Sequence, residues 1–137
     1  MAQIFNSHPT VALRFQPLFS YGHKGSLSET STTKEIESFF SDIEKSKDLF
    51  TLMRTETQKN YPVFAKKIHP TLIVFKETRY LNVMRNILSS DADVLVLGII
   101  RNPLATLASW VCAPKEFSTN WDLAEEWRFA NKKNNDR

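Results

Sequence analysis

The 137-residue sequence is poor in the features that mark disulfide-rich, secreted and membrane proteins. Its single cysteine, Cys112, excludes an internal disulfide and is typical of a reducing compartment, so we predict a cytoplasmic protein. Cys112 follows Val111 in an apolar segment, and we expect it to be buried as packing. No apolar run approaches the roughly 18 residues of a membrane span. The N-terminal residues MAQIFNSHPTVALRF lack the basic and apolar regions of a secretory signal.

Glycine is also scarce, and its placement excludes the common phosphate-binding loops. Gly22, Gly25 and Gly98 form neither a GxxxxGK nor a GxGxxG pattern. No His, Cys or acidic residues have the spacing of zinc ligands, and we predict no metal site. Basic residues are mixed with acidic ones and the aromatic residues have core-like spacing, so we expect no nucleic-acid partner.

The composition that remains is typical of one globular domain. Hydrophobic residues make up 42% and charged residues 24% of the chain, which is enough to build a core beneath a charged surface. The length suits a single domain over residues 1–137. The net charge of +3 mildly favours an anionic partner.

Short apolar runs alternate with amphipathic segments along the chain. We predict strands at 11–15, 71–75 and 94–100, and helices at 2–7, from Thr33 as N-cap to about Met53, at 79–88, at 103–112 and from 119–122 toward 131. The run VLVLGII at 94–100 is apolar on both faces, as in a central parallel strand. The pattern predicts an α/β fold with a parallel sheet flanked by helices. Helix 103–112 would pack on that sheet through Leu104, Leu107, Ala108 and Val111.

The strongest chemical pattern is GIIRNPLATLASW, residues 98–110. Arg101 ends the predicted strand, Asn102 is a good N-cap and Pro103 a good first helical residue. Free N–H groups, the positive end of the helix dipole, the guanidinium and the hydroxyls of Thr106 and Ser109 would together favour a phosphate. The alternative is an arginine paired with a nearby acid and a serine that is merely exposed.

Three segments resemble the sulfotransferases that use 3′-phosphoadenosine 5′-phosphosulfate (PAPS). Arg101-Asn102-Pro103, with Ser109 eight residues after the arginine, resembles their 3′-phosphate-binding motif. Residues 8–11 (HPTV) and 15–18 (FQPL) resemble the HPDV and FEPL segments of carbohydrate sulfotransferases. Lys76, at a strand end, resembles the family lysine that contacts the transferring sulfuryl group.

The resemblance implies a P-loop NTPase-like sulfotransferase fold and transfer of a sulfuryl group from PAPS to a hydroxyl or amine. Arg101, Asn102 and Ser109 would bind the 3′-phosphate of PAPS. Lys76 would stabilise charge on the leaving oxygen, as a mobile ammonium can. The acceptor would be a small molecule or a carbohydrate.

The catalytic base is less defined by the sequence. The glutamate of FEPL is replaced by Gln16, whose amide cannot accept a proton and could only orient the substrate. Glu77 adjoins Lys76, so it would point to the opposite face unless the strand has already ended. His23, in a predicted loop over 22–33, is the remaining candidate for the base and would lie near the substrate.

Two family features have no counterpart in this sequence. An RSGTT-like sulfonate loop would precede the HP segment, and a further C-terminal segment would cover the adenine. We therefore expect the middle of a sulfotransferase domain, truncated at both ends and inactive alone. The alternatives are a P-loop-type nucleotide-binding or kinase-like module, disfavoured because no magnesium ligand accompanies a Walker lysine, and a non-catalytic binding domain.

Overall fold

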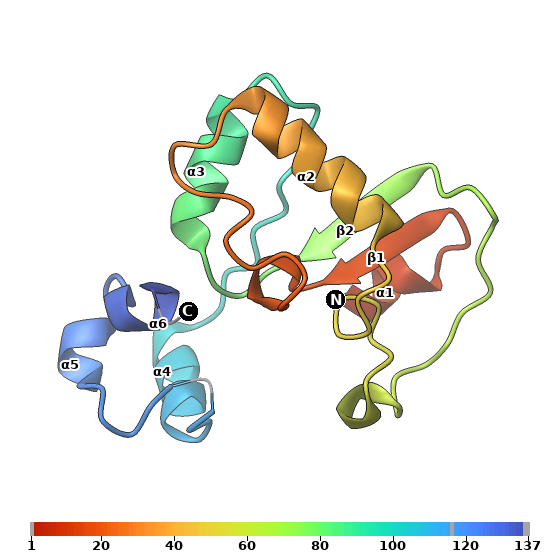
Figure 1. Ribbon diagram of the computed structural model, residues 1–137. Coiled ribbons are helices and arrows are strands. Elements are labelled where there is room, and N and C mark those ends of the chain that lie inside the picture. The colour runs from red at the N-terminus through yellow and green to blue at the C-terminus, as the bar shows by residue number, and fades with distance from the viewer. Residues whose placement is uncertain (1, 116, 136–137) are drawn as a thin grey trace. The chain divides into compact units, whose positions relative to one another are not determined.

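The computed structural model describes residues 2–115 and 117–135, and the chain divides into two compact units (Figure 1). The N-terminal unit is Met1–Ala92 and the C-terminal unit is Asp93–Arg137. Each unit has its own small core, and each is described by itself below.

The N-terminal unit is built around two parallel strands, β1 (Val11–Phe15) and β2 (Leu72–Lys76). The register runs from Val11 opposite Leu72 to Phe15 opposite Lys76. Val11 and Leu13 are buried. The predicted strand at 11–15 is confirmed, and the one predicted at 71–75 lies one residue later, at 72–76. Their parallel direction is confirmed, and the fold of this unit is mixed α/β.

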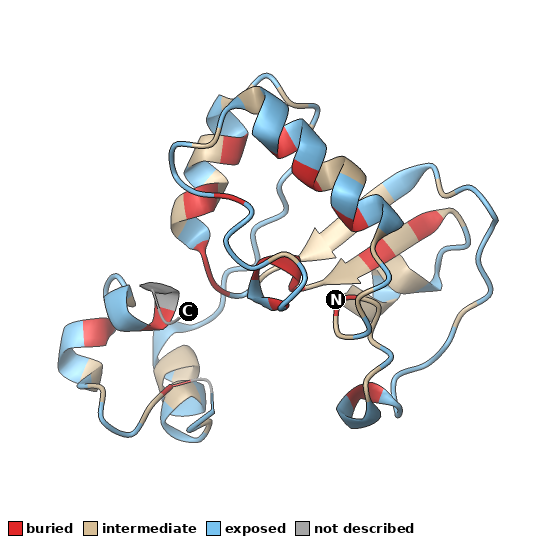
Figure 2. Cartoon of the chain, viewed as in Figure 1, coloured by how far each residue is buried: buried red, intermediate tan, exposed pale blue. Residues whose placement is uncertain are grey.

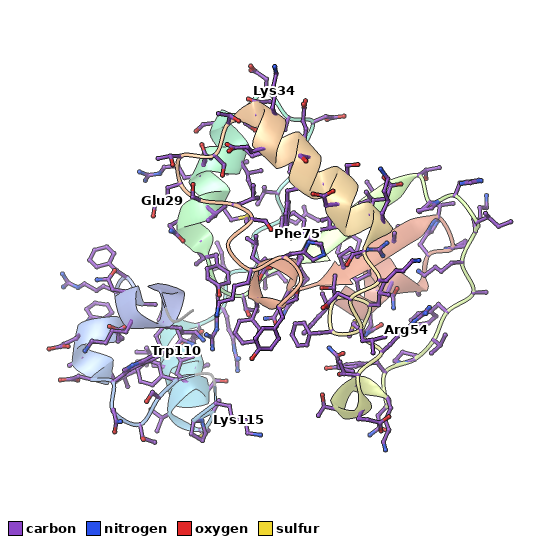
Figure 3. The ribbon with its side chains drawn as sticks, in the orientation of Figure 1. Glu29, Lys34, Arg54, Phe75, Trp110 and Lys115 are labelled. Atoms are coloured by element: carbon purple, nitrogen blue, oxygen red, sulfur yellow. The ribbon has the colours of Figure 1, made fainter. Side chains whose placement is uncertain are left out.

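Helix α2 (Thr33–Lys45) lies across one face of the strand pair (Figure 1). It buries Ile36, Phe39 and Ile43. The ring of Phe75 on β2 packs against those of Phe39 and Phe40, with centroids 6.0 and 5.6 Å apart, beneath the helix (Figure 3). Aromatic pairs at this separation contribute about 0.5–1.5 kcal/mol beyond the area they bury, so these rings hold α2 to the strands.

Helix α2 begins with a capping box, and its N-cap residue, Thr32, lies one residue before the predicted N-cap. The Thr32 hydroxyl accepts the N–H of Glu35 at 3.3 Å, and the Glu35 carboxylate accepts the N–H of Thr32 at 2.6 Å. Thr33, the predicted N-cap, is instead the first helical residue.

The end of α2 at Lys45 is earlier than the predicted end near Met53. The Arg14 guanidinium on β1 donates to the carbonyl oxygens of Ile43 and Glu44, each at 2.5 Å. It thereby supplies donors to carbonyl groups that have no partner within the helix because they lie at its C-terminal end. Phe50 contacts Phe15 from the following turn, with centroids 5.6 Å apart. Phe50 therefore belongs to the core without belonging to the helix, and for this reason the apolar pattern overestimated the helix.

The other helices of the N-terminal unit are short. They are α1 (Ala2–Ser7), the 3-10 turns η1 (Pro17–Phe19) and η2 (Glu56–Gln58), and α3 (Leu81–Ser89). Helix α3 buries Val83 and Ile87. It begins two residues after the predicted start at 79, because Tyr80 has a left-handed backbone (φ 59°) that cannot continue a helix.

The C-terminal unit contains α4 (Pro103–Val111), α5 (Leu123–Glu126) and α6 (Asn131–Asn135). Its core is aromatic: Phe117 stacks on Trp110 with centroids 5.4 Å apart and meets Trp121 edge-on at 5.4 Å. The single helix predicted from 119–122 toward 131 is divided, since Ala130 has φ 49° between α5 and α6. The buried carboxylate of Glu126 accepts the N–H of Lys132 at 2.8 Å and so caps α6.

The predicted strand at 94–100 is absent (Figure 2). Among the described residues β1 and β2 form the only sheet, and in 94–100 Leu95 is 86% and Ile100 98% exposed. A central strand needs hydrogen-bonding partners on both edges, and its own apolar pattern cannot supply them. The predicted three-stranded sheet is therefore wrong.

Helix α4 forms as predicted but does not use the predicted face. Leu104 is 76% and Val111 64% exposed, and Trp110 carries the packing of the helix onto Phe117. Cys112, expected to be buried, is exposed as well. These errors share one cause, because the stripe from 104 to 111 and its neighbour Cys112 were assigned to a sheet that the described residues of this unit do not form.

The two candidate caps of α2 can be separated by mutation. We expect Thr32→Ala to lower the free energy of unfolding by about 1 kcal/mol, because it removes the acceptor for the Glu35 N–H. Thr33→Ala should change it much less, since alanine suits the first helical turn. Urea unfolding of both variants measures the difference, and an equal loss in both would contradict the capping box.

Candidate functional site

Three of the residues singled out from the sequence meet at the carboxyl ends of β1 and β2. Gln16 follows β1 directly, Lys76 is the last residue of β2, and Glu77 comes next. The N–H of Gln16 donates to the carbonyl oxygen of Lys76 at 2.8 Å. The parallel register therefore brings the FQPL segment and the strand-end lysine, about sixty residues apart in sequence, to one edge of the unit.

Glu77 lies beyond the end of β2, which meets the condition set for it as a base. Its Oε1 accepts the N–H of Leu18 at 2.8 Å, so the carboxylate turns toward the segment after β1. Its Oε2 is buried and has no hydrogen-bond partner among the described residues. This side chain thus has one anchored oxygen and one buried oxygen without a hydrogen-bond partner.

The environment of Glu77 raises its pKa to about 7, from an ordinary value near 4.5. Burial is the main cause, because it penalises the charged form. The N–H groups of Leu18 and Thr78 and the charge of Lys76 act in the opposite direction and are outweighed. A carboxyl that titrates near neutral pH is matched to general base catalysis.

Gln16 has a constrained conformation at the same edge. It is buried and has a left-handed backbone (φ 41°, ψ 55°), which is uncommon for a residue other than glycine. Its side-chain nitrogen donates to the Thr78 hydroxyl. The amide is therefore oriented by the turn after β2, and its predicted role in orienting substrate remains a prediction.

Two cations lie on aromatic rings beside these groups. Lys76 Nζ is 4.9 Å from the centroid of the Phe15 ring, and the Arg79 guanidinium carbon is 4.8 Å from that of Phe19. Both rings also contact Phe50. Cation–π contacts of this kind stabilise a cation by about 0.5–2 kcal/mol, so the rings hold the two charges near the strand ends.

Arg79 and Thr78 are site residues that the sequence interpretation missed. Arg79 is only 2% exposed, although it was assigned to the exposed start of a helix at 79. The signal was present in the run Lys76-Glu77-Thr78-Arg79, four polar residues in succession directly after a buried strand. Such a run at the carboxyl end of a parallel strand is where ligand-binding groups gather in α/β sheets.

His23 is held at the end of α2. Its Nε2 lies 2.8 Å from the Ser46 hydroxyl, and its ring meets that of Phe39 edge-on at 6.3 Å. These contacts make it half-buried and give it a structural tie. Its predicted place near the substrate stays a prediction.

In the C-terminal unit, Asn102 caps α4 as predicted. Its Oδ1 accepts the N–H groups of Leu104 and Ala105 at 2.9 and 3.3 Å, while Thr106 donates its N–H to the Asn102 carbonyl at 3.0 Å. The expectation of free N–H groups at this helix start is therefore wrong. A side chain that caps a helix occupies the same donors that an anion would use.

Of the three other groups of that motif, the Thr106 hydroxyl donates to the Asn102 carbonyl at 3.1 Å, and the remaining two are open to solvent. Arg101 and Ser109 are both exposed. Within the part of the chain that the structure describes, Arg101 forms no ion pair with an acid, so the alternative interpretation of a paired arginine is not supported. The anion-binding capacity of this segment rests on one guanidinium, one hydroxyl and the dipole of α4.

Among residues 2–115 and 117–135, no three His, Cys, Asp or Glu side chains gather as a metal-binding group. None of the helices in these ranges combines the length and apolar content needed to cross a bilayer.

Comparisons of the chain with protein-family models, with curated proteins and with solved structures each found no match. The residues at the strand ends and the motif before α4 are therefore the features of the chain that bear on its function.

The raised pKa of Glu77 predicts how the free energy of unfolding depends on pH. A carboxyl whose pKa is raised by folding holds its proton longer in the folded state, so the free energy of unfolding falls as pH rises from about 4.5 to 7. The shift corresponds to about 3 kcal/mol. Glu77→Gln keeps the acceptor for the Leu18 N–H and removes this penalty. We expect it to be more stable than the parent by up to about 3 kcal/mol near pH 8, with the advantage vanishing near pH 4.

Chemical unfolding at the two pH values measures this difference. Glu37→Gln on the exposed side of α2 is the matched control and should leave the pH dependence unchanged. Parallel stability curves for Glu77→Gln and the parent would show that Glu77 is not buried as described.

Proposed function

We propose that this chain is a cytoplasmic sulfotransferase of the PAPS-dependent class, which moves a sulfuryl group to a hydroxyl or amine of a small molecule or carbohydrate. The observation that carries the proposal is the half-buried side chain of Glu77, whose Oε2 is buried and whose pKa is about 7, next to the cation Lys76. Both lie where two parallel strands end, and Lys76 is one of the residues that resemble that family.

Glu77 is the base in this proposal. Its unpartnered Oε2 accepts the proton of the acceptor hydroxyl as the new oxygen–sulfur bond forms. Its Oε1 stays fixed on the Leu18 N–H, which keeps the carboxylate oriented during the transfer. The glutamate of the family's FEPL segment is thereby replaced by a carboxyl from the neighbouring strand end.

Lys76 stabilises the leaving group. As the bond between sulfur and the bridging oxygen breaks, negative charge develops on that oxygen, and an ammonium can follow it. Arg79, buried beside the same aromatic cluster, adds a second positive charge to this edge. Gln16, held by Thr78, orients the acceptor.

PAPS supplies the activated sulfuryl group, and its 3′-phosphate is the part that the C-terminal unit would bind. The exposed Arg101 and Ser109 fit that role, while Asn102 orders the start of α4. Ser109 lies about 9 Å along the helix from Pro103, at 1.5 Å per residue. The phosphate would therefore lie beside the first two turns of α4 and not on its axis.

Nucleotide binding tests the donor half of the proposal. Arg101→Ala should weaken binding of adenosine 3′,5′-bisphosphate by about ten- to a hundredfold, because a charge-assisted hydrogen bond contributes roughly 1.5–3 kcal/mol. Ser109→Ala should cost less, since it removes a neutral donor. Calorimetric titration with this nucleotide and with adenosine 5′-phosphate measures both effects.

The control for that titration is Arg128→Ala, an exposed arginine of the same unit that lies on Trp127. It should leave the affinity unchanged. Equal losses for the two nucleotides in Arg101→Ala would show that the arginine does not recognise the 3′-phosphate and would remove the best residue of the proposal.

A transfer assay tests the catalytic half. Because no glycine-rich loop in this sequence can hold the 5′-phosphosulfate, we expect the purified chain to transfer radiolabelled sulfate only slowly. Any transfer should fall with Glu77→Gln and Lys76→Met and be unaffected by Glu37→Gln. Fast turnover would overturn the expected need for such a loop, and turnover indifferent to Glu77 would overturn its role as the base.

A further inference from the structure

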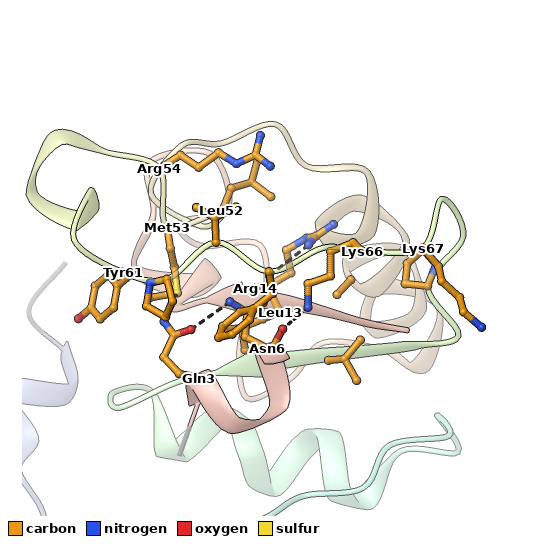
Figure 4. A pocket seen from close by; sticks show the side chains of 16 residues that line it. Gln3, Asn6, Leu13, Arg14, Leu52, Met53, Arg54, Tyr61, Lys66 and Lys67 are labelled. Atoms are coloured by element: carbon orange, nitrogen blue, oxygen red, sulfur yellow. Dashed lines mark hydrogen bonds between the residues drawn. The ribbon is translucent and has the colours of Figure 1, made fainter. Parts of the chain in front are cut away.

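A cavity of about 280 Å³ lies along the edge of β1 that faces away from β2 (Figure 4). Its walls come from β1, from α1 and from the segments 52–54 and 61–67. Lys76 and Glu77 are not among the described residues that line it, so it is separate from the site at the strand ends. Its size is near the lower limit of small-molecule sites, which is about 300 Å³.

The backbone of β1 makes one polar wall of this cavity. The N–H of Phe15 donates to the Thr51 carbonyl at 2.8 Å, on the edge away from β2. Alternate residues of a strand direct their backbone groups to the same edge, so the N–H of Leu13 is turned toward the cavity. At the other end of the edge, the N–H of Lys67 donates to the Pro9 carbonyl at 2.9 Å. Because both ends are closed, the space suits a compact ligand and not an added strand.

The charged side chains among the described residues that line the cavity are all positive. Among the described lining residues none carries a carboxylate, and four carry a positive charge: Arg14, Arg54, Lys66 and Lys67. Arg14 is used by carbonyl groups at the end of α2. Lys66 Nζ points to the carbonyl oxygen of Asn6, as Figure 4 shows, and partial burial lowers the pKa of its ammonium. A bound anion would offset that penalty.

Two hydrogen-bond donors remain available among the described residues that line the cavity. Lys66 Nζ donates to the carbonyl oxygens of Asn6 and His8, which uses two of its three N–H groups. The Asn6 side-chain nitrogen donates one hydrogen to Gln3 Oε1 at 3.0 Å and keeps the second. A carboxylate has two acceptor oxygens and could take one bond from each.

The opposite wall is apolar and strained. Leu52, Met53 and Phe64 contribute side chains to it. Met53 has φ 59°, a left-handed conformation that costs a residue with a side chain about 1–3 kcal/mol and is concentrated at ligand sites. A ring or short aliphatic chain would cover this wall.

We propose that the cavity binds a small organic carboxylate, with the carboxylate group on Lys66 and Asn6 and an apolar body against Met53 and Phe64. The proposal is independent of sulfuryl transfer, because it uses none of the residues at the strand ends. It adds to the N-terminal unit a site for a small acidic molecule.

The probe is 2-naphthoate, and 2-naphthamide is its neutral counterpart of similar shape. Titration of the ¹⁵N-labelled chain followed by NMR should show saturable binding of the naphthoate, with shifts at the amides of Leu13, Met53 and Lys66. The naphthamide should bind at least about tenfold more weakly, since it lacks the charge that Lys66 recognises.

Two variants test the residues. Lys66→Gln should weaken naphthoate binding by about tenfold or more, and Lys66→Arg should recover part of the loss. Asn6→Asp, which keeps the shape of the side chain and places a negative charge at the site, should also weaken it and does not depend on the folding of the Lys66 variants. Lys59→Gln removes an exposed lysine outside the cavity and should have no effect.

Four results would overturn the proposal. The first two are equal affinity for the two probes and equal losses in Lys66→Gln and Lys59→Gln. The third is a set of shifts confined to residues 76–79, which would place the naphthoate at the strand ends. The fourth is the absence of saturable naphthoate binding up to millimolar concentration.

Discussion

The register of β1 against β2 is the constraint on which the N-terminal unit depends. It places Phe15 opposite Lys76, so the residues after each strand, Gln16 and Glu77, come out at the same edge. A slip of one residue would turn every side chain of one strand to the other face. Arg14 would then no longer reach the carbonyl groups at the end of α2, and Lys76 would leave the Phe15 ring. The candidate base, its neighbouring cation and the end of α2 thus depend on one pairing.

Much of this unit could be predicted from the sequence because its signals are local. The strand at 11–15 is a short apolar run closed by Gln16-Pro17, and that at 71–75 ends in a polar run. The condition under which Glu77 could act as a base could also be predicted from the sequence, because adjacent side chains point to opposite faces only while the strand continues. Whether β2 ended at Lys76 was a single-residue question that the pattern could not answer. The structure answers it, and the raised pKa of Glu77 follows from the burial that comes with that position.

The rest depended on tertiary contacts. The sequence pattern predicts that Arg79 starts a helix. In the structure, the left-handed backbone at Tyr80 and the contact with the Phe19 ring account for its burial. Phe50 fits the face of α2, yet it packs from a turn. Asn102 was assigned both a capping role and free neighbouring N–H groups, and these exclude each other because one side chain takes the donors. The apolar run at 94–100 carries a strong strand pattern, but a strand is defined by its partners and not by its own side chains.

The exposed run at 94–100 affects how readily molecules of this protein associate at high concentration. Its seven residues, VLVLGII, combine high β-propensity with the absence of charge and proline, which is the composition of segments that associate into cross-β aggregates. Acidic Asp91 and Asp93 precede it and Arg101 follows it, so charged residues flank the run on both sides as gatekeepers. Their repulsion is electrostatic and is screened by salt, whereas the attraction between apolar segments is strengthened by sulfate and phosphate. Colloidal stability of the protein therefore decreases as such salts are added, and the charges beside one short segment set how quickly it does so.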